Sequence, residues 1–335
     1  MDSPKPFPIL RLPFLAIEEV FKAMHPFEII NFSLITERTK AVTKNMTFRS
    51  KYTIRLCVHK QLGIEIYGTN HLVSCTYLMT SYKQKLEKTV EDEHSGYITR
   101  RVFNYSNDPV DEWKQLCKYV MEIFKRKSIN MLSMTMDEFV DHNVSIIDFL
   151  KNYEILVDIC MLYQTREENN VDEHVAYLLE NVTVNVELLS GLNIKDKNFY
   201  GKIPKNLNDL FIYYSEWIGY ERLLEIDSKH VTLENDEISD KEWNLFLKKW
   251  MAMETNLNLA YLRLSRKELG TFREHVLYDI PYEVVSEDVS RILPCRYKLT
   301  QKVNGGIDIR RIDGKTATFF VPRPGWNGSF LMCIH

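Results

Sequence analysis

The sequence has 335 residues, of which 45% are hydrophobic and 27% charged, and its formal net charge at pH 7 is −3. This length suits two or three globular domains, and the small net charge predicts neither nucleic acid nor a membrane as a partner. The 12 glycines lack the spacings of dinucleotide-binding loops and nucleophile elbows, and Gly63 and Gly68, which have the outer P-loop spacing, are followed by Thr69 instead of lysine. The closest cysteines, Cys57 and Cys75, are 18 positions apart, which excludes paired-cysteine zinc and redox motifs. We therefore expect no enzymatic activity, no cofactor and no metal.

The amino terminus and the apolar stretches indicate the compartment. Residues 1–6 carry proline and charge where a secretory signal peptide needs an apolar run. The densest apolar stretch, residues 155–163, contains Asp158 and is too short to span a bilayer. We expect a soluble protein of the cytoplasm and/or the nucleus, with reduced cysteines.

The first predicted unit, residues 6–50, has the hydrophobic spacing of three short helices. Leu12 and Pro13 open the first helix, which ends before Pro26 because a residue that precedes proline avoids the helical conformation. The second helix begins at Pro26, and the third covers residues 37–44. Three helices of this size bury little surface alone, so the unit is expected to need a partner.

Residues 51–125 are predicted to be a β-rich linker region that ends in a helix. Three segments alternate or are β-branched, as half-buried strands are: residues 52–58, 64–67 and 97–103. The helix starts with Asp108 as its N-cap and Pro109 at its first position. The acidic run at residues 91–94 is expected to be a solvated loop.

Residues 126–321 carry short strand-like cores with amphipathic helical segments between several of them. The cores, which begin 18–35 residues apart, are 132–134, 157–159, 192–194, 210–212, 231–233 and 262–264. The helical segments are 144–150, 171–179, 220–226 and 241–251. A strand with L-x-L followed by a helix is typical of leucine-rich repeats, so we predict an irregular leucine-rich-repeat-like horseshoe. The alternative is an ordinary α/β domain whose strands contain the same pattern.

The end of this region is predicted to be a β-meander. Strands at 297–303 and 307–312 flank the turn signal Asn304-Gly305-Gly306, and a third strand at 315–321 follows Asp313-Gly314. The remaining residues, 322–335, are expected to be a flexible tail. The predicted fold class is therefore α+β or an α/β repeat, with three N-terminal helices, then the horseshoe and then the meander.

Polar clusters allow two interpretations each. Asp137, Glu138, Asp141 and His142 have the chemistry of metal ligands or an acid–base pair, but they follow a predicted strand, where polar residues usually cap a helix or line a loop. The window 38–60 contains seven basic residues and no acid, so it suits either phosphate contacts or a solvated face. We favour the structural interpretation for both.

Aromatic residues gather in the repeat around residues 211–220. Tyr213 and Trp217 are the two that we single out as substrate-binding candidates, because tyrosine and tryptophan contribute large contact areas at protein interfaces. The competing interpretation is that these side chains belong to the core.

The first unit resembles an F-box, whose signature is a Leu-Pro pair that opens a helix followed by two further short helices. Residues 7–13 (FPILRLP) through Lys44 match this signature. Further segments resemble the F-box-associated domain of the large nematode F-box family: 105–114, 201–207, 215–221, 244–250 and 304–309. The resemblance covers roughly residues 6–321 and makes residues 126–321 the F-box-associated, substrate-binding domain.

This resemblance implies a non-catalytic substrate receptor of an SCF-type cullin–RING ubiquitin ligase. The F-box would dock on a Skp-type adaptor, and the C-terminal domain would recruit a target protein. The implied adaptor-binding residues are Leu12, Pro13, Ile17, Phe27, Ile30 and Leu34, although some of them must instead hold the helices together. The third helix carries Arg38–Val42 where many F-boxes have a large apolar residue. The alternative is a repeat-type protein-binding scaffold that acts outside a ubiquitin ligase.

Overall fold

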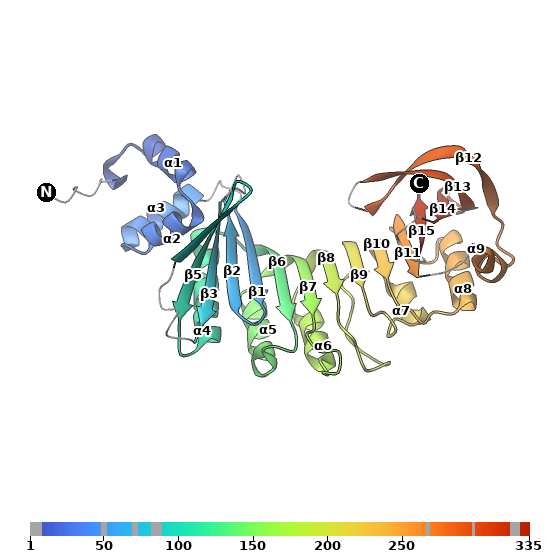
Figure 1. Cartoon of the computed structure of the whole chain (residues 1–335), viewed down its shortest axis with the longest axis horizontal. Helices are drawn as coiled ribbons and strands as arrows, with labels where there is room; N and C mark the ends of the chain where they lie inside the picture. The colour runs from blue at the N-terminus through green and yellow to red at the C-terminus, as the bar shows by residue number, and fades with distance from the viewer. Residues whose placement is uncertain are drawn as a thin grey trace. The chain divides into compact units, whose positions relative to one another are not determined.

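The computed structural model describes residues 9–47, 52–68, 73–81, 89–265, 269–296, 299–321 and 329–335 (Figure 1). The chain divides into two compact units, Met1–Val157 and Asp158–His335, called here the N-terminal and the C-terminal unit.

Three helices open the N-terminal unit: α1 (Phe14–Ala23), α2 (Pro26–Ser33) and α3 (Glu37–Thr47), after a 3-10 turn at Ile9–Arg11. They lie where the hydrophobic spacing predicts them. Pro13 precedes α1, and the backbone amide of His25 donates to Glu28 Oε2 at 2.9 Å, which caps α2. The apolar side chains of Ile17 and Ile30 are buried between the helices.

These helices are attached to the rest of their own unit through α4 (Pro109–Ile123). Thr47 Oγ1 donates to the carbonyl of Ile123 at 2.6 Å, and the hydroxyls of Ser33 and Tyr119 lie 2.8 Å apart. The expected need for a partner is thus met in part within the chain, because α4 covers one side of α2 and α3.

A sheet with the strand order β6-β1-β2-β3-β5-β4 forms the body of the N-terminal unit. Its strands are β1 (Thr53–Val58), β2 (Leu62–Tyr67), β3 (Val73–Thr80), β4 (Thr89–His94), β5 (Tyr97–Tyr105) and β6 (Ser128–Thr135). The three predicted strands are confirmed as β1, β2 and β5, and α4 begins at Pro109 with Asp108 as its cap. A short 3-10 helix (Val140–His142) and α5 (Asn143–Asn152) follow β6.

The solvated loop predicted at residues 91–94 is wrong. These residues belong to β4, an edge strand whose side chains are all exposed. Arg100 donates to Glu91 Oε2 at 2.6 Å and Arg101 pairs with Asp92, both across the antiparallel pair β4–β5. Cross-strand ion pairs, which sequence periodicity does not reveal, hold this acidic segment in the sheet.

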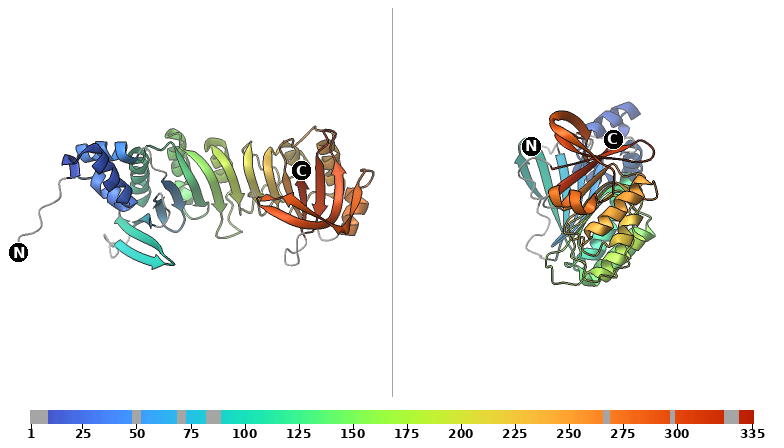
Figure 2. Two further views of the ribbon diagram at one scale, coloured as in Figure 1. Left: turned by 90° about the horizontal axis from the view of Figure 1, so that it is seen from above. Right: turned by 90° about the vertical axis from the view of Figure 1, so that its right-hand side faces the viewer.

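The C-terminal unit alternates strands and helices in its first half. Its strands are β7 (Leu156–Tyr163), β8 (Val184–Ser190), β9 (Leu207–Ile212), β10 (Ser228–Leu233) and β11 (Tyr261–Ser265). Strands β8 to β11 pair in parallel, and α6 (Asp172–Asn181), α7 (Tyr220–Glu225) and α8 (Asp240–Met251) lie on one face of the strands (Figure 2). This half is a mixed α/β structure, and the leucine-rich-repeat horseshoe stays a prediction.

One of the six predicted strand cores is wrong. Residues 192–194 are not in a strand, and the strand of that repeat is β8, eight residues earlier in its start. Val184, Val186 and Leu188 carry the β pattern, whereas Leu192 fits the L-x-L template without pairing to a neighbour.

The second half of the unit begins with a helical segment, α9 (Leu269–Thr271) and a π-helix (Phe272–Val276). A β-meander follows as β12 (Glu283–Pro294), β13 (Thr300–Arg310), β14 (Thr316–Phe320) and β15 (Ser329–Ile334). Strand β14 is the one predicted at 315–321, β13 joins the two strands predicted at 297–303 and 307–312, and β12 and β15 were not predicted. These strands pair antiparallel in that order, and β15 pairs with β11. The flexible tail predicted for residues 322–335 is therefore wrong for β15, whose Met332 and Cys333 are fully buried, while residues 322–328 lie outside the described ranges.

The hairpin turn predicted at Asn304-Gly305-Gly306 is also wrong. Strand β13 runs through these residues, and the register of β12 shifts opposite them, between Val285 and Ser290. Gly305 and Gly306 have φ angles of +66° and +117°, which bend the paired strands instead of reversing them. The bend folds the far half of the β12–β13 pair, called here the arm, over the open face of β14, β15 and β11 (Figure 1).

The conformation of Gly306 gives the first prediction. We expect Gly306→Ala to lower the free energy of unfolding by about 1–3 kcal/mol, because the backbone is left-handed there. An added Cβ would also lie 3.0 Å from the carbonyl oxygen of Phe319. Urea denaturation followed by circular dichroism measures the loss. Gly270→Ala is the control, since nothing lies within 4 Å of its added Cβ, and an equal loss in both variants would refute the bend as the cause.

Candidate functional site

A row of polar side chains crosses the open face of the C-terminal strands, opposite the helices. Glu187 of β8 is in register with Asp209 of β9, which is in register with His230 of β10. Successive strand residues point to opposite faces, so the neighbouring Leu188 and Leu210 face the helices and are buried. We call Glu187, Asp209 and His230 the polar row.

Arg296, at the end of the arm, reaches the polar row from above. Its Nε donates to Asp209 Oδ1 at 2.7 Å, and its Nη2 donates to Glu187 Oε1 at 3.1 Å. The guanidinium also lies 5.5 Å from the centre of the Phe211 ring. The side chains of Arg296, Glu187 and Asp209 are 18%, 10% and 7% exposed, so this ion cluster is largely shielded from water.

Electrostatics at Asp209 reflect two opposing effects. Burial by itself raises the pKa of this carboxyl, whereas the close contacts with His230 and Arg296 lower it. The effect of the contacts is larger, and the pKa of Asp209 lies below its ordinary value of 3.8. His230 Nδ1 is 3.3 Å from Asp209 Oδ1. The carboxyl of Asp209 therefore stays ionised at neutral pH, and the guanidinium of Arg296 is the cation that it holds.

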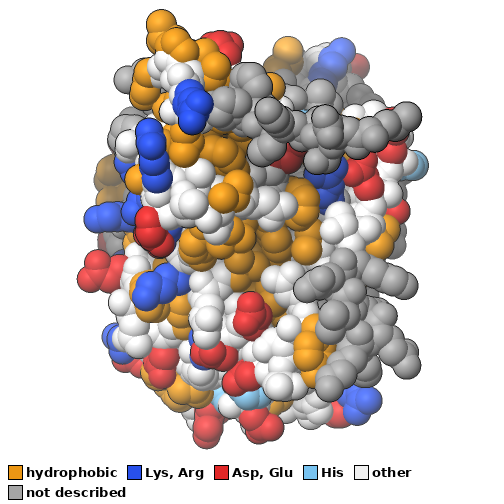
Figure 3. Space-filling view, turned by 90° about the vertical axis from the view of Figure 1, so that its left-hand side faces the viewer, with side chains coloured by type: hydrophobic (Ala, Val, Ile, Leu, Met, Phe, Trp, Pro, Cys, Tyr) orange, Lys and Arg blue, Asp and Glu red, His pale blue; other side chains and the backbone are white. Residues whose placement is uncertain are grey.

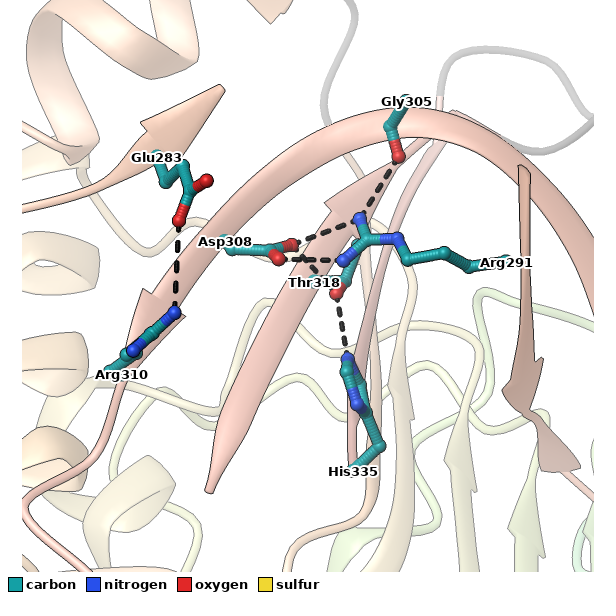
Figure 4. Close-up of polar contacts among 7 residues, drawn as sticks. All are labelled: Glu283, Arg291, Gly305, Asp308, Arg310, Thr318 and His335. Atoms are coloured by element: carbon teal, nitrogen blue, oxygen red, sulfur yellow. Dashed lines mark hydrogen bonds and ion pairs between the residues drawn. The ribbon is translucent and has the colours of Figure 1, made fainter. Parts of the chain in front are cut away.

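A second polar network holds the arm at its bend. Arg291 of β12 donates from Nη1 to Asp308 Oδ2 at 2.6 Å and from Nη2 to the carbonyl of Gly305 at 3.1 Å (Figure 4). Thr318 Oγ1 donates to Asp308 Oδ1 at 2.8 Å and lies 3.0 Å from His335 Nε2. The network ties both strands of the bend to β14 and β15, which fixes the direction in which the arm leaves the sheet.

The arm is also attached through apolar contacts. Leu293 and Val303 on its underside form one core cluster with Tyr261, Phe320 and Leu331. Arg296 follows this anchored segment closely in the chain. The fold thus places the guanidinium over the polar row by packing, not by the ion pairs alone.

The six predicted adaptor-binding residues fall into different environments. Ile17 and Ile30 are buried and hold the helices together, whereas Leu12 is partly buried. Phe27 is partly covered by the guanidinium of Arg100, 5.0 Å from its ring centre. Pro13 is exposed and Leu34 is 62% exposed.

Sequence reasoning missed three exposed apolar residues on the same helices. Phe14 and Leu15, at the start of α1, are 60% and 72% exposed, and Ile35, just after α2, is 65% exposed. Hydrophobic side chains gather on this end of the molecule (Figure 3). Leu15 lies off the periodic stripe of α1, and this departure is the signal that could have identified it. Phe14 lies on that stripe, three positions before the buried Ile17, so periodicity predicts it to be buried although it is exposed.

The two predicted substrate-binding aromatics do not come together at a surface. Trp217 is only 6% exposed and packs edge-on against Phe199, with ring centres 4.9 Å apart. Tyr213 is 43% exposed and packs against Tyr214, whose hydroxyl donates to Glu167. Trp217 therefore belongs to the core, and only Tyr213 is placed to contact another molecule.

The acidic cluster after β6 is spread over a turn and a short 3-10 helix. Asp141 and His142 are exposed, and Asp137 and Glu138 are partly buried. Within the described ranges, no three potential ligands among His, Cys, Asp and Glu come close enough to hold a metal ion. Nor is any helix of the described part long and apolar enough to cross a membrane.

All three residues of the polar row were missed by sequence reasoning. Glu187, Asp209 and His230 each interrupt a short apolar strand at the same register position. A charged or titratable residue inside successive buried strands is the available signal. Arg296 gives no such signal, because its contact partners are 87 and 109 positions away in the chain.

Comparison with known proteins places a family segment on this face. Residues 198–264 match a family model described as F-box associated, and this segment contains β9, β10, α7, α8 and nearly all of β11. The chain is also 24% identical over 336 residues to the Skn-1 dependent zygotic transcript 15 protein of Caenorhabditis elegans, with 93% of each chain covered. No solved structure matches. The matched segment includes Asp209 and His230 but not the N-terminal helices.

Proposed function

We propose that the chain is a non-catalytic substrate receptor of an SCF-type cullin–RING ubiquitin ligase in the cytoplasm or nucleus. In this proposal α1–α3 form an F-box that docks on a Skp-type adaptor, and the C-terminal unit recruits a target protein. The observation that carries the proposal is the F-box-associated segment at residues 198–264 in a chain whose N-terminal helices expose large apolar side chains. Exposed apolar side chains on a small helical unit are typical of a docking surface.

The adaptor contact is assigned to the exposed residues of the helices. Phe14 and Leu15 at the start of α1, with Leu34 and Ile35 at the end of α2, would be covered by the adaptor. Burial of each such side chain contributes roughly 1.5–3 kcal/mol. Pro13 would keep the start of α1 in place, and Ile17 and Ile30 would maintain the helix packing beneath.

Target recruitment is assigned to the open face of β8–β10 and its rim. Tyr213 offers an exposed aromatic ring just after β9, whereas the carboxylates of the polar row are already held by Arg296. The reaction itself needs no catalytic residue of this chain. Holding a target lysine near a ubiquitin thioester raises its effective concentration, which is the whole contribution of a receptor.

One observation favours the alternative of a protein-binding scaffold outside a ligase. Lys40 and Lys44 of α3 pair with Glu122 of α4 at 3.0 Å and 3.1 Å. The polar third helix therefore uses these basic side chains for contacts within the chain, where many F-box helices would present an apolar residue to the adaptor.

Capture by a purified Skp-type adaptor tests the proposal. We expect Leu15→Ala combined with Leu34→Ala to weaken adaptor binding at least tenfold, because two exposed leucines lose their contact area. Affinity is measured by surface plasmon resonance with the full chain, and circular dichroism checks that the variant is folded.

A matched variant distinguishes specific docking from non-specific binding through exposed apolar side chains. Ile312→Ala combined with Val321→Ala removes side chains that are 75% and 55% exposed in the C-terminal unit, and it should leave adaptor binding unchanged. Absence of adaptor binding by the unmodified chain, or equal binding by the leucine variant, would contradict the proposal and favour the scaffold.

A further inference from the structure

The arm ends beside a pair of cysteine sulfurs that no feature of the proposed function uses. Cys295 follows β12, and Cys333 lies on β15, two strands that are not hydrogen-bonded to each other. Their Sγ atoms are 3.8 Å apart. Cys295 is partly exposed, while Cys333 is fully buried against the underside of the arm.

We propose that Cys295 and Cys333 are a modification site, at which an oxidant such as hydrogen peroxide forms a disulfide that locks the arm onto the sheet. A disulfide needs an S–S distance of about 2.05 Å, so the two sulfurs must approach by less than 2 Å. A change of side-chain torsion at partly exposed Cys295 supplies most of this movement. The backbone around the pair is already held by Leu293, Val303 and the Arg291–Asp308 network.

The chemistry proceeds in two balanced steps. Peroxide oxidises the accessible Cys295 thiol to a sulfenic acid and releases one water molecule. The Cys333 thiol then attacks the sulfenic sulfur, the S–S bond forms and a second water molecule leaves. The two thiols lose two hydrogen atoms in total, and one peroxide is reduced to two water molecules.

The surroundings set the rate of the reaction. Burial raises the pKa of the Cys295 thiol, and burial raises the pKa of Cys333 further. Little thiolate is present at neutral pH, so the disulfide forms slowly in a reducing compartment and faster as the pH rises.

The disulfide would act directly on the polar row. Cys295 precedes Arg296 in the chain, so the link to β15 would hold the guanidinium over Glu187 and Asp209. If the open face of β8–β10 receives a target, as the proposed function has it, oxidation would fix the position of Arg296 on the face that the target meets. The formation of the disulfide itself does not depend on that function.

Mass spectrometry of the full chain after treatment with hydrogen peroxide tests the site. Trypsin without reduction should release residues 292–296 joined to residues 316–335, two hydrogen masses below the sum of both peptides. The melting temperature should rise by at least about 5 °C and return on treatment with dithiothreitol. Both changes should vanish in Cys295→Ser.

A control variant and three contrary results complete the test of the disulfide. Cys57→Ser, which alters another partly buried thiol, should still form the linked peptide and show the same rise in melting temperature. Unlinked peptides in the oxidised chain, a link to another cysteine, or a covalent dimer on a non-reducing gel would each overturn the proposal. None of these results bears on adaptor binding, so the failure of one proposal leaves the other standing.

Discussion

Replacement of Arg296 by methionine should lower the free energy of unfolding by about 3 kcal/mol, because it leaves two nearly buried carboxylates without their cation. Glu187 and Asp209 are directly opposite each other on neighbouring parallel strands, where like charges repel. Methionine keeps much of the apolar stem of arginine, so the loss reports the charge rather than the packing. Urea denaturation is the measurement, because guanidinium chloride is a salt and would itself screen the charges.

Two further variants identify the cause of this loss. The triple variant Glu187→Gln, Asp209→Asn and Arg296→Met should recover most of the stability, since it removes the charges together. Arg310→Met is the matched control, because its side chain is 75% exposed and pairs with Glu283 only at 3.8 Å. It should change stability by less than about 0.5 kcal/mol. A loss under 1 kcal/mol for Arg296→Met would show that the cluster is not a shielded ion network.

The same variant has a defined pH dependence. The pKa of Asp209 is lowered in the folded chain, so its ionised form stabilises the fold above the ordinary value of 3.8. This stabilisation is lost as the pH falls below 3.8 and through the folded pKa. The stability gap between the unmodified chain and Arg296→Met should therefore be full at neutral pH and narrow below pH 3.8.

Trp113→Ala should destabilise the N-terminal unit by about 3–5 kcal/mol, the cost of truncating a large buried aromatic side chain. Trp113 on α4 is fully buried, packs against Phe149 and donates from Nε1 to the carbonyl of Gly63 at 3.0 Å. The substitution leaves a cavity under the sheet and removes the hydrogen bond to the carbonyl of Gly63 on β2.

The effect should extend to the proposed docking helices. Helix α4 also carries Tyr119 and Ile123, which bind Ser33 and Thr47 of the N-terminal helices. Hydrogen exchange in α3 should therefore accelerate together with exchange in α4 and β2. Trp113→Phe should lose only about 1–2 kcal/mol, mainly the hydrogen bond. Tyr97→Ala, at a ring 57% exposed, should change stability little, and a similar loss there would contradict the assignment.

Helices and single strands were accessible from local pattern. Helix starts depend on local signals, and α1, α2 and α4 begin at such signals, which are Pro13, Pro26 and Asp108. Alternation likewise located β1, β2 and β5. The exposed edge strand β4 was not predicted, because a strand without a buried face has no alternating hydrophobic pattern.

Glycine at residues 305 and 306 shows how local signals mislead. Positive φ angles are required at both positions, as the sequence indicates, but they serve a bend within a paired strand. Whether such residues reverse the chain or bend it depends on what lies opposite. Here β12 and β14 occupy both sides of β13, which leaves no room for a reversal.

Local patterns in the sequence are enough to locate most helices and strands, to show how few enzyme motifs there are and to find the segments that resemble a family. Which apolar residues are exposed for docking depends on the packed structure, because periodicity marks a helix face but not what covers it. Tertiary structure also brought Arg296 to Glu187 and Cys295 to Cys333, pairs separated by 109 and 38 positions. Contacts over such distances depend on strand register and on the direction of the arm, and no local pattern encodes either.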